Sequence, residues 1–287
     1  MPNQQSPSSA PPSVSRPRSA PDALEAILAR ERGWAARNGL ATDAAGHLES
    51  PSDGLCFEPS GDTVARLARH PDRPLGEAGK RGSASELGSA WALACNVVEA
   101  IPTEALGGLL AAVGAEGRAV RRSFVHPPPS LEGEGARTPV AQIDREHGGP
   151  VFVEVHGAAL ARCSGSAPHA LPLPETGWGD LEGCRRLAAE CAQRFAALPL
   201  AGTLRRIRAL TRSHGRRGFR YVVVRPHFDR HHDEALRRGY DGVRMRIGGE
   251  VDFEALDVAW LHARLAHAGE GAHPALAWLA DRYLDRR

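Results

Sequence analysis

The sequence predicts an α/β (α+β) fold in which helices cover one mixed β-sheet. Three short segments with alternating or apolar β-branched residues follow one another at 118–126, 137–144 and 149–160. An amphipathic helical segment from Asp180 then separates them from a strongly apolar strand at 219–228. A meander followed by a crossover helix needs antiparallel and parallel pairing in one sheet, with helices on its faces.

Helical periodicity precedes these strands. Residues 21–40 place apolar side chains at helical spacing, and Asp22 is a candidate N-cap. The residues that follow are rich in Gly and Pro and predict loops with a short helix at 63–70. Ser85 can cap the clearest helix, which Pro102 ends. Its apolar stripe comprises Leu87, Trp91, Ala94, Cys95 and Val98, and a second short helix starts at Pro102 and Thr103.

Further segments follow the fourth strand. Residues 233–240 predict a helix or a turn, and residues 243–253 predict a strand with a bulge. Helical periodicity extends over 255–269 and 273–286. We therefore expect a disordered Pro/Ser-rich tail, then a single domain with a core and C-terminal helices. The expected boundaries are 1–22 for the tail, 23–287 for the domain, about 85–228 for the core and 253–287 for the helices.

Composition excludes several classes of function. The formal net charge is +2, so nucleic-acid binding would depend on local clusters of basic residues. The five cysteines form no CxxC pair, which favours reduced thiols. The sequence has no run of about 18 apolar residues, so we expect no membrane span. The sequence contains no GxxxxGK[ST] phosphate loop, helix-turn-helix, zinc-finger or Gly-X-Ser-X-Gly pattern. We expect a cytoplasmic protein with no membrane partner.

Two carboxylates stand on the second and third predicted strands. Asp144 ends one strand, and Glu154 lies inside the next, on the same side as Phe152 and His156 because side chains alternate along a strand. The turn at 145–149 contains glycines suited to positive φ. A tight hairpin would bring the carboxylates together, where they could share Mg²⁺ or Mn²⁺ for phosphodiester hydrolysis. His156 could then supply positive charge, act as a base or bind the metal.

The same residues resemble a known superfamily. PD-(D/E)XK nuclease-like proteins place an Asp near the end of one strand and an (Asp/Glu)-X-Lys triplet on the next, and "QIDREHGGPVFVEVHG" is similar in spacing and apolar setting. His156 stands where that triplet has lysine. Ser89 through Asn96 looks like the leading helix of a bacterial group of this superfamily, and "FRYVVVRPHFD" and the C-terminal helices resemble later elements. The resemblance covers roughly Ser85 to Tyr283.

This resemblance implies a restriction endonuclease-like mixed sheet with an αβββαβ core. It implies a metal-dependent nuclease that hydrolyses phosphodiester bonds of nucleic acid, with DNA as the expected substrate and Mg²⁺ or Mn²⁺ as the cofactor. Asp144, Glu154 and His156 would be catalytic, and the two carboxylates would hold the metal. Gln142 could take the metal position in another register. Glu99, on the leading helix, could touch the metal or simply be a solvated helix end.

Arginines gather just before the fourth strand. Arg205, Arg206, Arg208, Arg216 and Arg217 all fall within residues 202–220, next to that strand. Guanidinium groups next to a core strand could neutralise phosphates of a bound nucleic acid. A charged helix face is the alternative interpretation of this cluster.

Two other hypotheses stay open. The fold could be a catalytically inactive scaffold that binds nucleic acid or a protein, since the usual lysine is missing and Lys80, the only lysine, stands outside the motif. Alternatively, "RPHFDRHHDE" could hold Zn²⁺ or Fe²⁺, with His227 and Asp229 as candidate ligands. The sequence does not predict an oligomeric state.

Overall fold

The computed structural model describes residues 20–44, 46–63, 87–125, 138–158, 160–161, 178–194, 198–270 and 274–284. The predicted disordered tail up to residue 19, most of the short helix at 63–70, and both Lys80 and Ser85 lie outside these residues.

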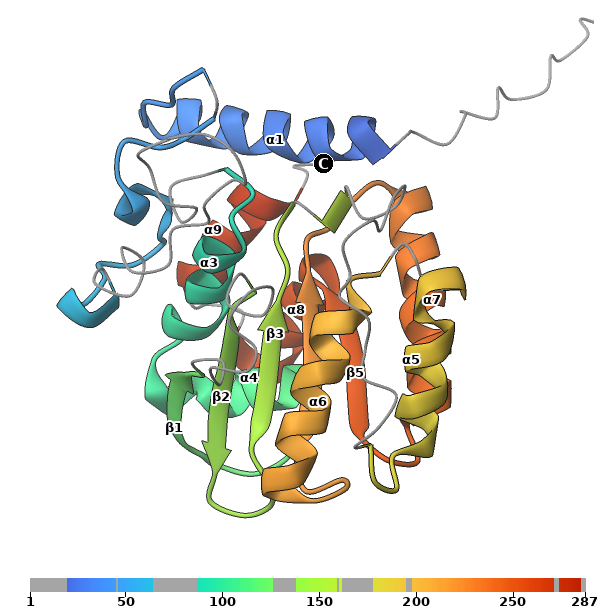
Figure 1. Cartoon of the computed structure of the whole chain (residues 1–287). Helices are drawn as coiled ribbons and strands as arrows, with labels where there is room; N and C mark the ends of the chain where they lie inside the picture. The colour runs from blue at the N-terminus through green and yellow to red at the C-terminus, as the bar shows by residue number, and fades with distance from the viewer. Residues whose placement is uncertain are drawn as a thin grey trace, which may run out of the picture.

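One mixed sheet forms the centre of the fold (Figure 1). Its strands lie side by side in chain order, β1 to β5. The pairs β1–β2 and β2–β3 are antiparallel, whereas β3–β4 and β4–β5 are parallel. This confirms the predicted meander, crossover and αβββαβ order. The strands are β1 Ala119–Phe124, β2 Val140–Arg145, β3 Val151–Val155, β4 Arg220–Arg225 and β5 Asp252–Asp257.

Helices cover both faces of this sheet (Figure 1). Short 3₁₀ and π-helical turns accompany some of them. The 3₁₀ turns are Pro51–Gly54 and Thr103–Ala105, and the π-helical turns are Cys95–Glu99 and Ala266–Glu270. The α-helices are α1 Ala20–Arg37, α3 Ala90–Ala94, α4 Leu106–Ala112, α5 Glu182–Arg194, α6 Leu200–His214, α7 Arg230–Ile247, α8 Val258–Leu265 and α9 Pro274–Tyr283.

The sheet separates two apolar cores. On one face Phe152 and Tyr221 pack with residues of α5, α6 and α7. On the other face Val153 and Val222 pack with α4, α8 and α9. Strand β3 is buried along its whole length, as is nearly all of β4, because both faces of these central strands are covered. A polar side chain on either strand therefore has to find its partners inside the protein.

Several predicted boundaries are wrong in the structure. The leading helix begins at Ala90 with Ser89 as its cap, and Asp22 lies in the first turn of α1, not at its N-cap. Residues 243–247 belong to α7 and not to a strand, because Leu236, Tyr240, Val243 and Ile247 continue one buried helical stripe. The last strand is β5, and it lies beyond the predicted core boundary of 228.

Helix α1 lies across the carboxyl ends of the parallel strands and packs against α9 (Figure 1). The contact contains a fully buried ion pair. Arg282 on α9 donates from Nε and Nη2 to Glu31 Oε2 at 3.0 and 2.9 Å, and its Nη1 donates to the carbonyl of Gly54. Its guanidinium carbon lies 4.4 Å from the ring centre of Trp34. The first and last described helices are thus joined through one cation.

Within the described residues, no single helix has the length and apolar composition of a membrane span. The pair Ala90–Glu99 and Thr103–Ala112 passes that test together, with a bend of 84° between its halves. In the first half of this pair residues 91–98 are buried in the core of the protein, and much of α4 is buried as well.

Candidate functional site

Glu154 is a carboxylate inside the sheet. It stands on β3, opposite Val140 on β2 and Val223 on β4. Its side chain is directed to the face that α6 covers, the same face as Phe152, as alternation along the strand predicted. The residue is 0% exposed. Since Val140 is aliphatic, the neighbouring position on β2 offers no oxygen ligand.

Four side chains surround the Glu154 carboxylate. Thr203 and Arg206, three residues apart on one face of α6, both reach it: the Thr203 hydroxyl lies 3.1 Å from each oxygen, and Arg206 Nη1 donates to Oε1 at 2.7 Å. The Tyr221 hydroxyl on β4 donates to Oε2. His156 Nε2 lies 3.2 Å from Oε1. In this cage both carboxylate oxygens accept hydrogen bonds, and the guanidinium of Arg206 supplies a positive charge beside them.

The cage keeps Glu154 ionised. Burial alone would raise the pKa of Glu154, but the positive charge of Arg206, with His156 and the Tyr221 hydroxyl, outweighs burial and lowers the pKa to about 2. Burial likewise opposes the charge of Arg206, yet Glu154 raises the pKa of that guanidinium overall. The two groups therefore form a buried ion pair at the position predicted for catalysis.

Asp144 and Glu154 do not meet, so the predicted shared metal ion is wrong. Because Val140 is the partner of Glu154, Asp144 stands four residues further along β2, about 13 Å away at the rise of an antiparallel strand. Asp144 instead accepts hydrogen bonds from Arg121 Nε at 3.1 Å and from Gln142 Nε2 at 2.6 Å.

The two accessory candidates are also placed elsewhere. Gln142 stands opposite Phe152, two residues from the partner of Glu154. Glu99 accepts a hydrogen bond from the Thr63 hydroxyl at 3.0 Å, at the end of the π-helical turn. Neither residue belongs to the cage around Glu154.

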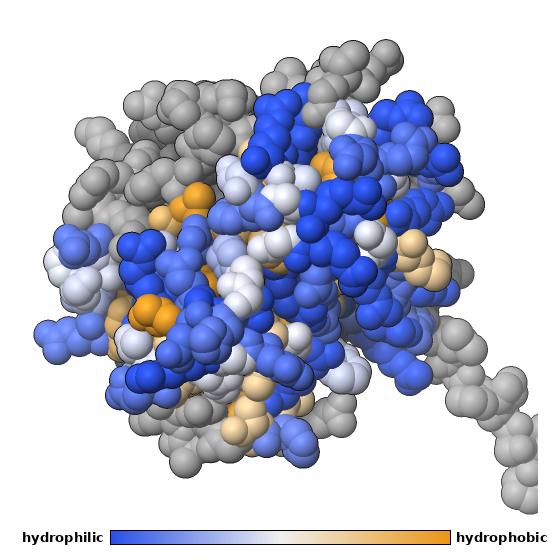
Figure 2. Space-filling view, turned by 90° about the horizontal axis from the view of Figure 1, so that it is seen from below, coloured by the Kyte–Doolittle hydropathy of each residue, from blue (hydrophilic) through white to orange (hydrophobic). Residues whose placement is uncertain are grey.

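The predicted phosphate-binding arginines divide into internal and exposed groups. Arg206 is buried in the cage, which contradicts its predicted role, and Arg208 lies 5.4 Å from the ring centre of Trp178. Arg205 is half-buried on α6. Arg216 and Arg217 are exposed in the loop after α6, and Arg216 lies 3.9 Å from Asp180. Figure 2 views the molecule from the end that carries this loop, and the surface seen there is largely hydrophilic.

A second polar cluster lies at the carboxyl ends of β4 and β5. Ligand atoms of His227, Asp233 and Asp257 lie within 4.8 Å of one another and could hold a metal ion. His227 and Asp233 come from the predicted metal segment, and Asp257 is a residue that the sequence did not reveal. Asp229 is not part of the group, because its carboxylate caps α7.

Arg225 already fills the centre of this second cluster. Its guanidinium forms ion pairs with Asp233 and, at 3.4 Å, with Asp257 Oδ2. His227 Nδ1 lies 2.6 Å from Asp233 Oδ2, and Asp257 Oδ1 accepts from the backbone of Trp260 at 2.8 Å. A cation would have to displace Arg225 from both carboxylates, so the arrangement fits an internal ion network better than a metal centre.

The second cluster predicts a pH dependence of stability. Its pairing with Asp233 raises the pKa of His227 above the ordinary value of 6.5. A raised pKa stabilises the folded state fully below about 6.5, and this contribution disappears as the pH rises through the folded value. We expect the stability difference between the wild type and His227→Gln, measured by urea unfolding from pH 5 to 9, to shrink as the pH rises. A difference that grows with pH would contradict this account.

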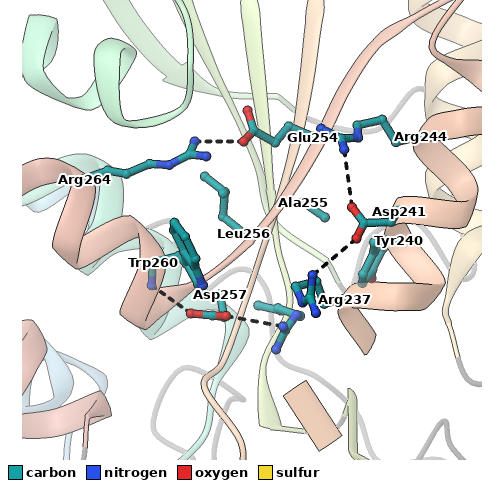
Figure 3. Close-up of a pocket in the computed structure, with 11 residues that line it drawn as sticks. Arg237, Tyr240, Asp241, Arg244, Glu254, Ala255, Leu256, Asp257, Trp260 and Arg264 are labelled. Carbon is teal, nitrogen blue, oxygen red and sulfur yellow. Dashed lines mark hydrogen bonds and ion pairs between the residues drawn. The ribbon is translucent and has the colours of Figure 1, made fainter. Parts of the chain in front are cut away.

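A pocket of about 240 Å³ opens beside β5, between α7 and α8 (Figure 3). Arg237 and Arg244 on α7 both face Asp241, and Arg264 on α8 pairs with Glu254. Trp260, also on α8, is 57% exposed. The sequence analysis did not predict this pocket, because it expected residues 243–247 to form a strand and not the end of α7.

Comparison with known proteins adds no assignment to this geometry. The chain matches no protein-family model, no curated protein and no solved structure.

Proposed function

We propose that this chain is a catalytically inactive protein of the PD-(D/E)XK nuclease-like type that acts as a protein-binding module. The αβββαβ order and the position of Glu154 and His156 on one face of the third strand support the structural part of the proposal. The observation that carries the functional part is the buried cage around Glu154, in which Arg206 supplies the positive charge.

Hydrolysis of a phosphodiester by this type of site would need a divalent cation with hard oxygen ligands. Among the residues that the structure describes, Glu154 is the one carboxylate at the cage, and the facing position on β2 is Val140. His156 is buried against that carboxylate, so it is not a free cation that could stabilise a phosphate. These features favour binding over catalysis.

We expect no metal-dependent cleavage of single- or double-stranded DNA or RNA by the wild type with Mg²⁺ or Mn²⁺. His156→Lys should also be inactive, because a lysine there would still face a carboxylate that Arg206 and Tyr221 hold. The measurement is gel electrophoresis of labelled substrates, with an active metal-dependent nuclease as the positive control. Cleavage by the wild type that Glu154→Gln abolishes, while the variant stays folded by circular dichroism, would overturn the proposal.

A protein partner is favoured because one of the arginines predicted to bind nucleic acid, Arg206, is buried and paired with Glu154. Arg206 is used in the cage and Arg208 lies over Trp178. Nucleic acid is the second candidate, since Arg216 and Arg217 stay exposed. Salt-dependent binding of a labelled oligonucleotide, weakened by Arg217→Gln, would favour it. A cytoplasmic location belongs to the same proposal and is supported by Cys56, Cys95 and Cys184, which form no disulfide in the structure.

A further inference from the structure

Strand β5 is the edge of the sheet on the side away from β1. Among the described strands it pairs with β4 alone. In an edge strand, alternate backbone N–H and C=O groups point away from the sheet and can pair with another chain. The pocket lies along this edge, where Glu254 and Ala255 in its wall are half-buried and Leu256 and Asp257 are buried.

The α7 side of the pocket carries surplus positive charge. Arg237 Nη1 and Arg244 Nη2 approach the one carboxylate of Asp241 at 3.8 and 3.6 Å, longer than hydrogen bonds. Both arginine side chains are 59% exposed. Two guanidinium groups thus share one negative charge and keep most of their N–H donors for a carboxylate brought by a ligand.

The α8 side of the pocket presents an exposed indole, Trp260, with the guanidinium carbon of Arg264 5.9 Å from its ring centre. Trp260 stands in the first turn of α8, and its backbone N–H donates to Asp257, the N-cap of that helix, at 2.8 Å. The cap fixes where the indole leaves the helix, and Figure 3 shows the ring facing the space beside Leu256. A tryptophan held in place and more than half exposed is a typical anchor for a protein partner.

These two sides fit the geometry of an added strand. We propose that the pocket at the free edge of β5 binds an extended polypeptide segment in which acidic and apolar residues alternate. This inference rests on the proposed protein-binding function and deepens it. The main chain of the segment pairs with the edge of β5. Because successive side chains of a strand point to opposite faces, acidic residues meet Arg237 and Arg244 while apolar residues meet Trp260.

Other occupants fit the pocket less well. A nucleic-acid strand carries a charge at every phosphate, and it would pass Asp241, Glu254 and Asp257, which also line the pocket. A second copy of the same edge would bring Arg237 and Arg244 against their own equivalents, and like charges facing each other oppose pairing. A peptide with spaced carboxylates and a neutral backbone avoids both conflicts.

The test is fluorescence anisotropy of the full chain with a fluorescein-labelled Glu-Val-Glu-Val-Glu-Val peptide. We expect saturable binding that weakens at least tenfold in the Arg237→Gln/Arg244→Gln double variant and also in Trp260→Ala. Arg238→Gln is the matched control, because Arg238 is an exposed arginine of the same helix outside the pocket lining, and it should bind as the wild type does. The Lys-Val-Lys-Val-Lys-Val peptide should not bind.

The inference would be overturned by no binding of the acidic peptide, by binding that the double variant leaves unchanged, or by displacement of the peptide by a twelve-nucleotide oligothymidine that needs the same arginines. A peptide methylated on alternate backbone nitrogens separates strand pairing from simple charge attraction. Equal affinity for the methylated peptide would also overturn it. If the acidic peptide does not bind, the strand-binding inference fails but the result of the nuclease assay stands. If the wild type cleaves nucleic acid in the nuclease assay, the proposed function fails whether or not the peptide binds.

Discussion

Glu154→Gln should lower the free energy of unfolding by about 3–5 kcal/mol, the usual cost of leaving one partner of a buried ion pair without the other. The loss arises because Arg206 stays buried and charged while its counter-charge is gone. Urea unfolding at pH 7 measures it. The double variant Glu154→Gln/Arg206→Met should recover a large part of the loss, since removing both charges removes the unpaired one.

The cage around Glu154 also makes the free energy of unfolding depend on pH in the acid range. A carboxyl group whose folded pKa is about 2, below its ordinary value of 4.5, stabilises the protein above about 4.5 and loses that contribution as the pH falls toward 2. Glu154→Gln should therefore be less sensitive to acid than the wild type over this range. Glu182→Gln, which removes an exposed partner of Arg185 and Arg186, is the control and should hardly shift the unfolding midpoint. Equal losses of stability in Glu154→Gln and Glu182→Gln would contradict the importance of burial for the Glu154–Arg206 pair.

Arg282→Met should destabilise the protein by a similar amount, about 3–5 kcal/mol, and should release α1. The substitution leaves Glu31 charged and 1% exposed, and it takes a donor from the Gly54 carbonyl and a cation from the face of Trp34. Urea unfolding measures the loss. Limited proteolysis under native conditions should show earlier cleavage within α1, because that helix loses its main polar contact with α9.

Arg37→Gln is the matched control for this prediction. Arg37 also joins α1 to α9, through Asp281 at 3.3 Å, but its side chain is 46% exposed. Water screens such a pair, so its removal should cost about 0–1 kcal/mol. If Arg282→Met proved no more costly than Arg37→Gln, burial would not be the source of the stability at this contact.

The order of the strands could be predicted because it depends on local patterns. β3 and β4 are short apolar β-branched runs, and of the two helices that separate them, α5 was predicted by its amphipathic spacing whereas α6 was seen only as a cluster of arginines. The turn before β3 was also predictable, since Gly148 adopts a φ of 85°. The last third of the chain was harder to predict. Residues 243–247 contain two arginines between apolar positions, so they alternate as a strand does, and only the longer spacing back to Leu236 identifies α7.

The candidate site was only partly predictable. Alternation placed Glu154 and His156 on one face, and the structure confirms their proximity. The predicted contact between Asp144 and Glu154 is wrong, because in a hairpin two residues face each other only if they lie equally far from the turn. Ile143 pairs with Val151, which places Asp144 beside the turn and Glu154 at the opposite end of the hairpin. Counting outward from the turn would have revealed this before the structure did.

The partners of Glu154 could not be read from the sequence. Thr203 and Arg206 are 49 and 52 residues away from it, on a helix whose rotation decides which arginines point inward. The sequence shows a run of arginines, but only the packing of α6 on the sheet selects Arg206 for burial and leaves Arg212 in solvent. Asp257 joins His227 and Asp233 for a similar reason, because the parallel pairing of β4 with β5 brings it there.

The contact between Glu31 and Arg282 also affects how the chain assembles during translation. The two residues are 251 positions apart, so at about 5–20 residues per second a ribosome needs about 12–50 s to make the intervening chain. Throughout that interval Glu31 has no guanidinium to meet, and the face of α1 that carries Trp34 lacks its cover from α9. The helix is synthesised well before α9 and can be locked in place only after α9 has been made.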